Sequence, residues 1–309
     1  MTPSPAVEVQ QVAPCGLAAV WLGLLRQLGL RDIVDARVGS ECELSHGAVI
    51  EAMVLNRLLS PRPLSRVEQW AEEAGLAALT GLDPSKLNDD RLGRALDAVC
   101  AVIPSVQAAL TARAVQAFKV EVTDVNCDTT TMFLEGYYED SELAARGHSK
   151  DYRPDHKQVK IALVTAEDGQ VPLTHITLAG NTGDVTTVPV ALMELRRQLP
   201  TQPVVVSGDA AMWSQANMDE VAKAGGIFVG PIAMNESVQK WVRTTALSIK
   251  VQVQLIRSQQ PVQYEAAIAG RFAVAGVADA GTRIVVCDAR RANEQQAERQ
   301  RRCQSWQAS

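Results

Sequence analysis

The sequence predicts an α/β protein with an N-terminal all-helical domain, then a mixed sheet of order β-β-β-α-β-α-β, then a partial β-rich region. Up to about residue 118, apolar residues recur every three or four positions, as in amphipathic helices. From Lys119 onward, stretches rich in Val and Ile indicate strands. Two short apolar strands follow helical segments, which is typical of buried parallel strands. The predicted domains are residues 1–118, 119–230 and 231–309.

Helix-ending and helix-capping residues divide the first domain. Gly29 ends the first helix, and Ser45 is placed to cap the second. Ser65 with Glu68 three residues later predicts a capping box, and Asn88 predicts another N-cap. The helices expected in this domain cover residues 17–28, 45–60, 65–74, 88–100 and 105–118.

Strands dominate the rest of the chain. The sheet is expected to contain strands at residues 120–128, 159–164, 171–178, 204–206 and 226–230, with helices at 186–199 and 215–224. The turn sequence at residues 167–169 predicts a hairpin between the second and third strands. After Pro231 we expect strands at residues 248–255, 262–268, 272–277 and 284–287, then a charged helix at 289–302.

Composition narrows the possible functions. With 30 Lys and Arg against 35 Asp and Glu, the net charge is −5, so no chain-wide basic signature for nucleic acid is present. The longest apolar stretch, residues 16–30, is broken by Arg26 and Gln27, which argues against a membrane span. The N-terminus lacks the pattern of a signal peptide, and the six cysteines are scattered without a CxxC pair. These features predict a cytoplasmic protein with buried, reduced thiols and no membrane partner.

Two aspartates are candidates for catalysis and metal binding. Asp128 is expected at the end of the first strand, and Asp209 directly follows the fourth. Because strands one and four are neighbours at the centre of such a sheet, the two carboxylates should lie close together. Carboxylates that close can share divalent cations, and a two-metal site activates water or a 3′-hydroxyl for phosphodiester cleavage. The alternative is that Asp128 caps a turn and Asp209 caps the following helix.

A dense basic stretch lies between the first two predicted strands. It contains Arg146, His148, Lys150, Arg153, His156, Lys157 and Lys160, against only Asp151 and Asp155. These cations could contact phosphates beside the carboxylates, or they could form an ordinary solvated loop. The two histidines have no cysteine at ligand spacing nearby, which disfavours a zinc site.

Four sequence blocks resemble the DDE transposases of bacterial insertion sequences, in family order and at family spacing. They are residues 127–133 (CDTTTMF), 147–159 (GHSKDYRPDHKQV), 179–184 (AGNTGD) and 205–212 (VVSGDAAM). The N-terminal domain is similar to the helical domain of the same transposases at residues 45–47, 56–58 and 89–97. The resemblance covers roughly residues 15 to 300.

The resemblance implies a ribonuclease H-like fold for the sheet and a β-rich insertion after its fifth strand. It implies that Asp128 and Asp209 are the first and second catalytic acids and bind Mg²⁺ or Mn²⁺ for DNA strand cleavage and transfer. Lys150, Arg153 and Lys157 would contact DNA. The expected partners are transposon ends, target DNA and a second copy or a full-length transposase, in the cytoplasm at the nucleoid. The helical domain would serve DNA binding or dimerisation.

The sequence departs from the family pattern at the third acid. The family carries a Glu in a Tyr-x2-Arg-x3-Glu-x6-Lys setting beyond the insertion, and this chain offers only Arg290, Glu294 and Arg301, with Cys287 in place of Tyr. We expect this partial match to the motif to be coincidental, and we expect the chain to stop inside the insertion. The alternative function is then a catalytically dead transposase that binds only DNA or the full-length enzyme. The family's Ala-Asp-Arg-Gly-Met also becomes Gly-Asp-Ala-Ala-Met at Asp209.

Overall fold

A computed structural model describes the protein at residues 16–39, 42–148, 150, 152–198, 204–223, 225–231, 236, 239–240, 250–257, 260–272 and 281–287. The chain forms two compact units. The first comprises Met1–Val122, Leu163–Ile176 and Glu194–Pro200, and the second comprises Thr123–Ala162, Thr177–Met193 and Thr201–Ser309. The first unit therefore contains the N-terminal helices together with parts of two strands and one helix that follow them.

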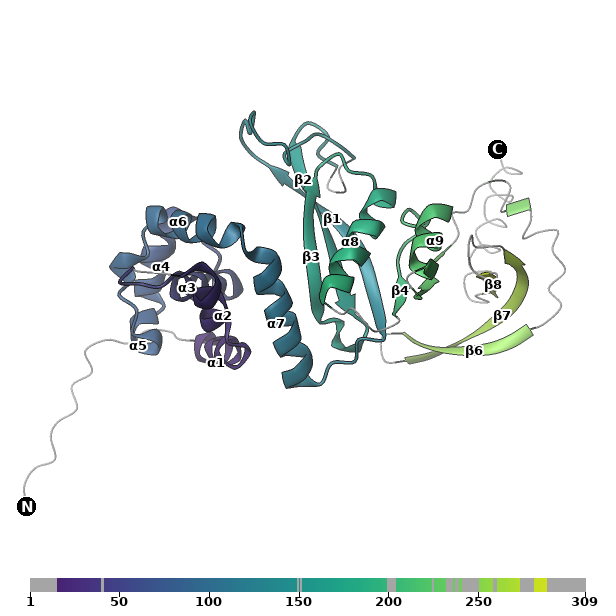
Figure 1. The fold of residues 1–309 in the computed structure, drawn as a ribbon, viewed down its shortest axis with the longest axis horizontal. Helices are drawn as coiled ribbons and strands as arrows, with labels where there is room; N and C mark the ends of the chain where they lie inside the picture. The colour runs from purple at the N-terminus through teal and green to yellow at the C-terminus, as the bar shows by residue number, and fades with distance from the viewer. Residues whose placement is uncertain are drawn as a thin grey trace, which may run out of the picture. The chain divides into compact units, whose positions relative to one another are not determined.

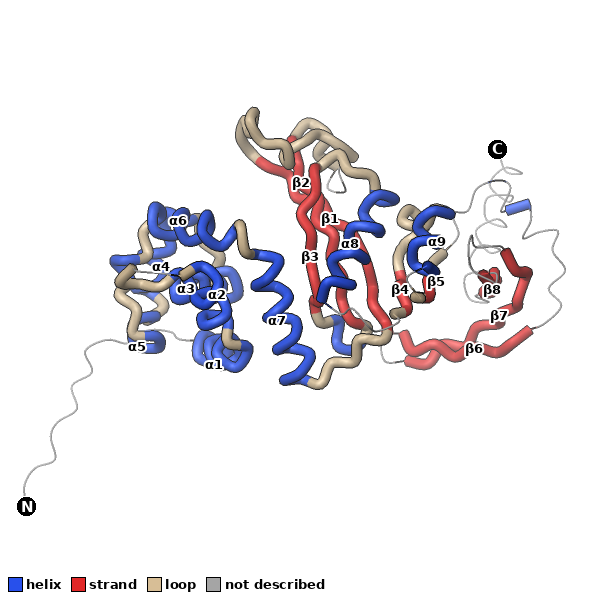
Figure 2. Tube along the Cα trace, viewed as in Figure 1, coloured by secondary structure: helices blue, strands red, loops and turns tan. Residues whose placement is uncertain are grey.

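Helices alone build the described chain up to residue 118, as the apolar spacing predicted (Figures 1 and 2). They are α1 (Ala18–Leu28), α2 (Leu30–Val38), α3 (His46–Leu59), α4 (Val67–Glu73), α5 (Leu76–Thr80), α6 (Asp89–Cys100) and α7 (Ile103–Phe118). The sequence analysis missed α2 and α5. Gly29 does end α1, but its left-handed φ of 68° lets the chain turn and start α2 one residue later.

Two of the three predicted helix caps are confirmed. The Ser45 hydroxyl accepts a hydrogen bond from the Ala48 N–H at 3.2 Å, and the Asn88 side chain accepts one from the Arg91 N–H at 2.9 Å. The capping box at Ser65 is wrong. Ser65 lies in a 3₁₀ turn, Leu64–Arg66, whose first hydrogen bond runs from Arg66 N–H to the Pro63 carbonyl, so α4 begins only at Val67.

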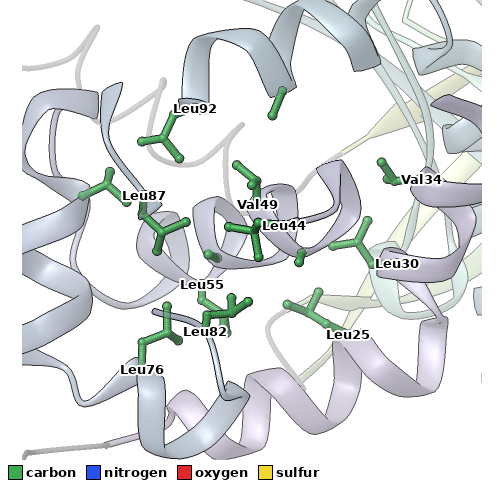
Figure 3. Packing of buried hydrophobic residues seen from close by; sticks show 14 of the residues in the cluster. Leu25, Leu30, Val34, Leu44, Val49, Leu55, Leu76, Leu82, Leu87 and Leu92 are labelled. Atoms are coloured by element: carbon green, nitrogen blue, oxygen red, sulfur yellow. The ribbon is translucent and has the colours of Figure 1, made fainter. Parts of the chain in front are cut away.

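A leucine-rich core holds the helices of the first unit together. Leu25 of α1, Leu55 of α3 and Leu87 point into one cluster (Figure 3). α7 also contacts the sheet hairpin within this unit, where the Thr111 hydroxyl donates to the Leu173 carbonyl at 2.5 Å. Among the cysteines whose burial the structure describes, the expectation of buried thiols holds for Cys127, whereas Cys42 and Cys100 are exposed. Within the described chain, no single helix is long and apolar enough to span a membrane; α6 and α7 qualify only as a pair bent by 81°.

The central sheet has the strand order β3-β2-β1-β4-β5. Its strands are β1 (Asp124–Leu134), β2 (Lys157–Ala166), β3 (Pro172–Ala179), β4 (Val205–Ser207) and β5 (Ile227–Val229), with α8 (Asp184–Gln198) before β4 and α9 (Gln215–Lys223) before β5. The predicted β-β-β-α-β-α-β order is confirmed. β1 starts four residues later and runs six residues farther than expected, because Thr129 and Thr131 continue its alternation of buried and exposed residues.

A second sheet follows, with antiparallel strands in the order β6-β7-β8. They are β6 (Lys250–Arg257), β7 (Gln260–Phe272) and β8 (Gly281–Cys287). The strands expected at residues 262–268 and 272–277 are joined as far as Phe272 into one strand, with a register shift between Ile268 and Gly270. The predicted helix at 289–302, including Glu294, lies outside the described residues.

Glu51 is a buried charge that should limit the stability of the first unit. It lies in α3 and is 3% exposed. Burial raises its pKa above the usual value of 4.5, against the opposing charges of Arg26 and Arg31. A raised carboxyl pKa means that the folded state loses stability as pH rises above that usual value.

We therefore expect Glu51→Gln to raise the melting temperature at pH 7 by about 2–4 °C. The gain should shrink as pH falls through 4.5, since below that value Glu51 becomes protonated in both the folded and the unfolded state. Thermal melts across this pH range test the expectation, with exposed Glu72→Gln of α4 as the control. A lower melting temperature for Glu51→Gln at pH 7 would contradict it.

Candidate active site

The pairing of β1 with β4 sets the positions of the two aspartates. The strands are parallel, and Asn126 pairs with Ser207 in register. Asp128 and Asp209 each lie two residues beyond this pair. Asp128 is not at the end of its strand as expected, because β1 continues to Leu134 while β4 ends at Ser207. β1 thus extends beyond Asn126, the residue that pairs with the last residue of β4.

Both aspartates line one pocket with a volume of about 460 Å³. Its lining residues are Asn126, Cys127, Asp128, Lys150, Ser207, Gly208 and Asp209. All of them belong to the second unit. The sequence-based expectation that the two carboxylates meet across the sheet therefore agrees with their shared pocket.

A tight turn presents Asp209. Its carboxylate accepts the Ala211 N–H at 3.0 Å, and the preceding Gly208 N–H donates to the Val229 carbonyl at 3.2 Å. The helix-capping alternative for Asp209 fails, since α9 starts only at Gln215 and the Ser214 hydroxyl accepts the Asn217 N–H. The turn-capping alternative for Asp128 fails as well, because Asp128 lies inside a strand.

The donor atoms of the pocket suit a hard divalent cation. Asp128 is 77% exposed, Asp209 is exposed, and both offer carboxylate oxygens. Cys127 is buried; burial first, then the charges of Asp128 and Asp209, raise the pKa of its thiol to about 12. The thiol therefore stays protonated, which leaves oxygen ligands of the kind that Mg²⁺ and Mn²⁺ prefer. Across the described residues, no cluster of three or more His, Cys, Asp or Glu side chains could hold a metal.

Lys150 is the cation of this pocket. Its ammonium nitrogen lies 3.8 Å from Asp128 Oδ1. The ammonium also donates to the Thr129 carbonyl and, at 3.2 Å, to the Thr129 hydroxyl. Its own backbone N–H donates to the Thr131 hydroxyl at 3.2 Å. Of the three cations expected to contact DNA, Lys150 thus lies beside the carboxylates.

The other two predicted DNA-contacting residues lie outside the pocket, Arg153 in the loop before β2 and Lys157 as the first residue of β2. The Arg153 guanidinium is 5.3 Å from the centre of the Phe133 ring, and its Nε is 3.4 Å from the Asp155 carboxylate. The Lys157 ammonium donates to the Tyr138 carbonyl at 2.6 Å. Neither residue lines the pocket. The sequence analysis grouped Lys150, Arg153 and Lys157 because they are close in sequence, but of the three only Lys150 lines the pocket.

Asp184, at the start of α8, is a carboxylate to which the sequence analysis gave no role. Lys160 lies 2.9 Å from its Oδ1, and the Thr129 hydroxyl donates to the same oxygen at 2.9 Å. Burial alone would raise the pKa of Asp184, but the hydrogen bonds from Lys160 and Thr129 outweigh it and leave the pKa lowered. Lys160 is 6% exposed on β2, so it is not a residue of a solvated loop. The only sequence signal for Asp184 is its place in the block at residues 179–184.

Other residues in the resembling blocks serve the fold around the pocket. The Gln158 side chain donates to the carbonyls of His148 and Gly180, at 3.1 and 2.8 Å. A Cβ on Gly147 would lie 2.4 Å from the Gly180 carbonyl oxygen, and a Cβ on Gly180 would lie 2.0 Å from that of Gln158. Only glycine permits this approach of three backbone segments.

We expect Gly180→Ala to destabilise the protein by at least about 2–3 kcal/mol, because the new methyl group meets backbone and not a movable side chain. Gly183→Ala in the same block is the matched control. A Cβ there has no atom within 4 Å, so its effect should stay within about 0.5 kcal/mol. Denaturant unfolding of the two variants measures the difference. Equal stabilities would show that the close packing of these segments does not matter.

Comparisons with known proteins agree with the geometry. The model of the transposase DDE domain matches residues 116–302, and a domain of unknown function, DUF4277, matches residues 7–106. No curated protein matches the chain significantly.

Solved structures of transposases resemble the chain at low identity. One is a piggyBac transposase synaptic complex with hairpin DNA, at 10% identity and a TM-score of 0.36, covering 91% of this chain. The chain spans 55% of that protein's length. Another is a pre-cleavage Mos1 transpososome, at 12% identity and a TM-score of 0.25, covering 63% of this chain and 70% of the other.

The DDE-domain match extends over more than half of the sequence and includes both pocket aspartates. The mixed sheet, with β1 at its centre and β4 parallel beside it, is of the ribonuclease H-like type that the sequence blocks implied. The chain therefore belongs to the DDE transposase family.

Proposed function

We propose that this chain acts as a DNA transposase whose acids Asp128 and Asp209 bind Mg²⁺ or Mn²⁺ for cleavage and strand transfer. The observation that carries the proposal is the parallel register, which puts the two aspartates at the same level and in one pocket. The reaction is hydrolysis of a phosphodiester at a transposon end, followed by attack of the freed 3′-hydroxyl on target DNA.

The side chains in and around the pocket have different roles in this proposal. When bound, the metal would supply an activated oxygen nucleophile and would stabilise the leaving oxygen. Asp128 on β1 and Asp209 in the turn after the adjacent strand β4 would hold it, so the register of the two strands sets their positions. The partners are transposon-end and target DNA, which Arg153 and Lys157 would contact outside the pocket, and a second copy or a full-length transposase. The working location is then the nucleoid, in the cytoplasm.

Asp128→Asn and Asp209→Asn should each reduce Mg²⁺-dependent cleavage of the element's own terminal DNA by at least about 100-fold. An amide keeps the shape of the side chain but loses the charge that a metal ligand needs. The control is Asp140→Asn, an exposed carboxylate in the loop between β1 and β2, outside the pocket. A gel-based cleavage assay measures all three variants. Cleavage by Asp128→Asn at the rate of Asp140→Asn would refute the assignment.

A second function, DNA binding without efficient cleavage, is favoured by the donor count. Only two carboxylates line the described pocket, and the second metal ion usually needs a third. This binding would be weak, because the net charge of −5 reduces non-specific attraction to DNA. In this case the protein would act by occupying transposon ends or by pairing with a full-length transposase.

The two functions differ in the effect of Glu294→Gln. For DNA binding without efficient cleavage, we expect weak cleavage by the unmodified chain and no change in this variant. Strong Mg²⁺-dependent cleavage that Glu294→Gln abolishes would instead make Glu294 the third catalytic acid. Cleavage and DNA binding should be measured on the same preparations, so that loss of folding is separated from loss of chemistry.

A further inference from the structure

Lys150 is anchored to β1 at two alternate threonines. Its backbone N–H donates to Thr131, and its ammonium donates to both the carbonyl and the hydroxyl of Thr129. Thr129 and Thr131 are themselves buried. A surface lysine samples many rotamers, whereas these contacts hold the Lys150 side chain along the strand and its ammonium beside Asp128.

Asp184 determines which way the Thr129 hydroxyl points. A hydroxyl has one hydrogen to donate, and the Thr129 hydroxyl donates it to Asp184 Oδ1 at 2.9 Å. Its oxygen lone pairs then remain to accept the Lys150 ammonium. Lys160 in turn holds Asp184, by the ion pair at 2.9 Å and by donating to the Thr182 carbonyl. The result is a chain of contacts from Lys160 through Asp184 and Thr129 to Lys150.

The ion pair with Asp128 does not use up the positive charge of Lys150. The two groups are 3.8 Å apart, which is longer than a hydrogen bond, and their side chains are 39% and 77% exposed. Exposed pairs of this kind contribute little to stability. An ammonium has three N–H donors, and Thr129 takes two of them. Among the contacts that the structure describes, one donor therefore remains for an anionic ligand in the pocket.

We propose that Lys150 contacts the phosphate at the cleavage position of bound DNA, and that Asp184, held by Lys160, positions it through Thr129. The inference rests on the proposed function, since it takes the pocket to be the place where the cleaved phosphate binds. The inference gives Lys150 a different role from Arg153 and Lys157, which would contact DNA outside the pocket. An ammonium fixed beside this phosphate would also stabilise the negative charge that develops there during cleavage.

Binding to two duplexes without metal tests the contact. Both carry the transposon end; one has the natural phosphodiester at the cleavage position and the other an uncharged methylphosphonate. In EDTA, we expect Lys150→Met to weaken binding of the first duplex about tenfold and of the second hardly at all. Lys150→Arg should retain most of the affinity. The control Lys157→Met should weaken binding of both duplexes equally.

The positioning role predicts a specific non-additivity. Asp184→Asn should weaken binding of the phosphodiester duplex about as much as Lys150→Met does, and the double variant should be no weaker than Lys150→Met alone. Melting temperatures show whether Asp184→Asn is folded, and Thr129→Val provides a second way to break the same chain of contacts. Additive losses on the phosphodiester duplex would remove Asp184 from the proposal.

The outcomes separate this inference from the proposed function. Equal losses by Lys150→Met on the two duplexes, or no discrimination between the duplexes by the unmodified chain, would overturn the phosphate contact. If cleavage in Mg²⁺ still depends on Asp128, only this inference has then failed. If Asp128→Asn cleaves like the unmodified chain, the proposed function itself has failed.

Discussion

The parallel pairing of β1 with β4 is the constraint on which the site depends. Two aspartates separated by eighty residues of chain are brought together only because Asn126 and Ser207 are paired and each aspartate follows by two positions. Side chains alternate between the two faces of a sheet, so a shift of register by one residue would send one carboxylate to the opposite face. The short strand β4 therefore contributes to the site through its register, which sets the position of the aspartate that follows it.

Cations lie beside two of the acids in and near the pocket, although the whole chain is acidic. Lys150 offsets Asp128, and Lys160 offsets Asp184 at the start of α8. The ion pair of buried Lys160 with partly buried Asp184 joins β2 to α8, and Thr129 connects it to the strand that carries Asp128. The residues that surround the two acids are thus held by polar contacts as well as by apolar packing. Gly147 and Gly180 complete this arrangement by letting the loop backbone approach β2 closely.

Much of this architecture could be predicted from the sequence, for identifiable reasons. The helices with strong caps at Ser45 and Asn88, and the apolar strands around residues 205 and 228, carry local signals that tertiary contacts do not override. The pairing of Asp128 with Asp209 followed from strand order alone. The end of β1 was harder to place, because threonines suit both a strand and the turn expected after Asp128.

The positions of the other residues around the site depend on contacts distant in sequence. Lys150, Arg153 and Lys157 look alike in one basic loop, but their partners are Thr129, Phe133 and Tyr138 on or just after β1. Asp184 has no local feature that marks it, since its role comes from Lys160 and Thr129. The short helix α2 was missed because Gly29 was taken as the end of a helix and not as a joint between two, and α5 begins after a second glycine with a left-handed backbone, Gly75.

Metal binding in the absence of DNA tests most directly whether Asp128 and Asp209 form one site. Electron paramagnetic resonance of free Mn²⁺ gives the dissociation constant for the unmodified chain, for each Asp→Asn variant and for the double variant. The account predicts that either single substitution weakens binding by at least about tenfold and that the second adds much less than the first, because both remove ligands from one ion. Mn²⁺ binding that survives the double substitution unchanged, or that falls with only one of the two aspartates, would contradict it.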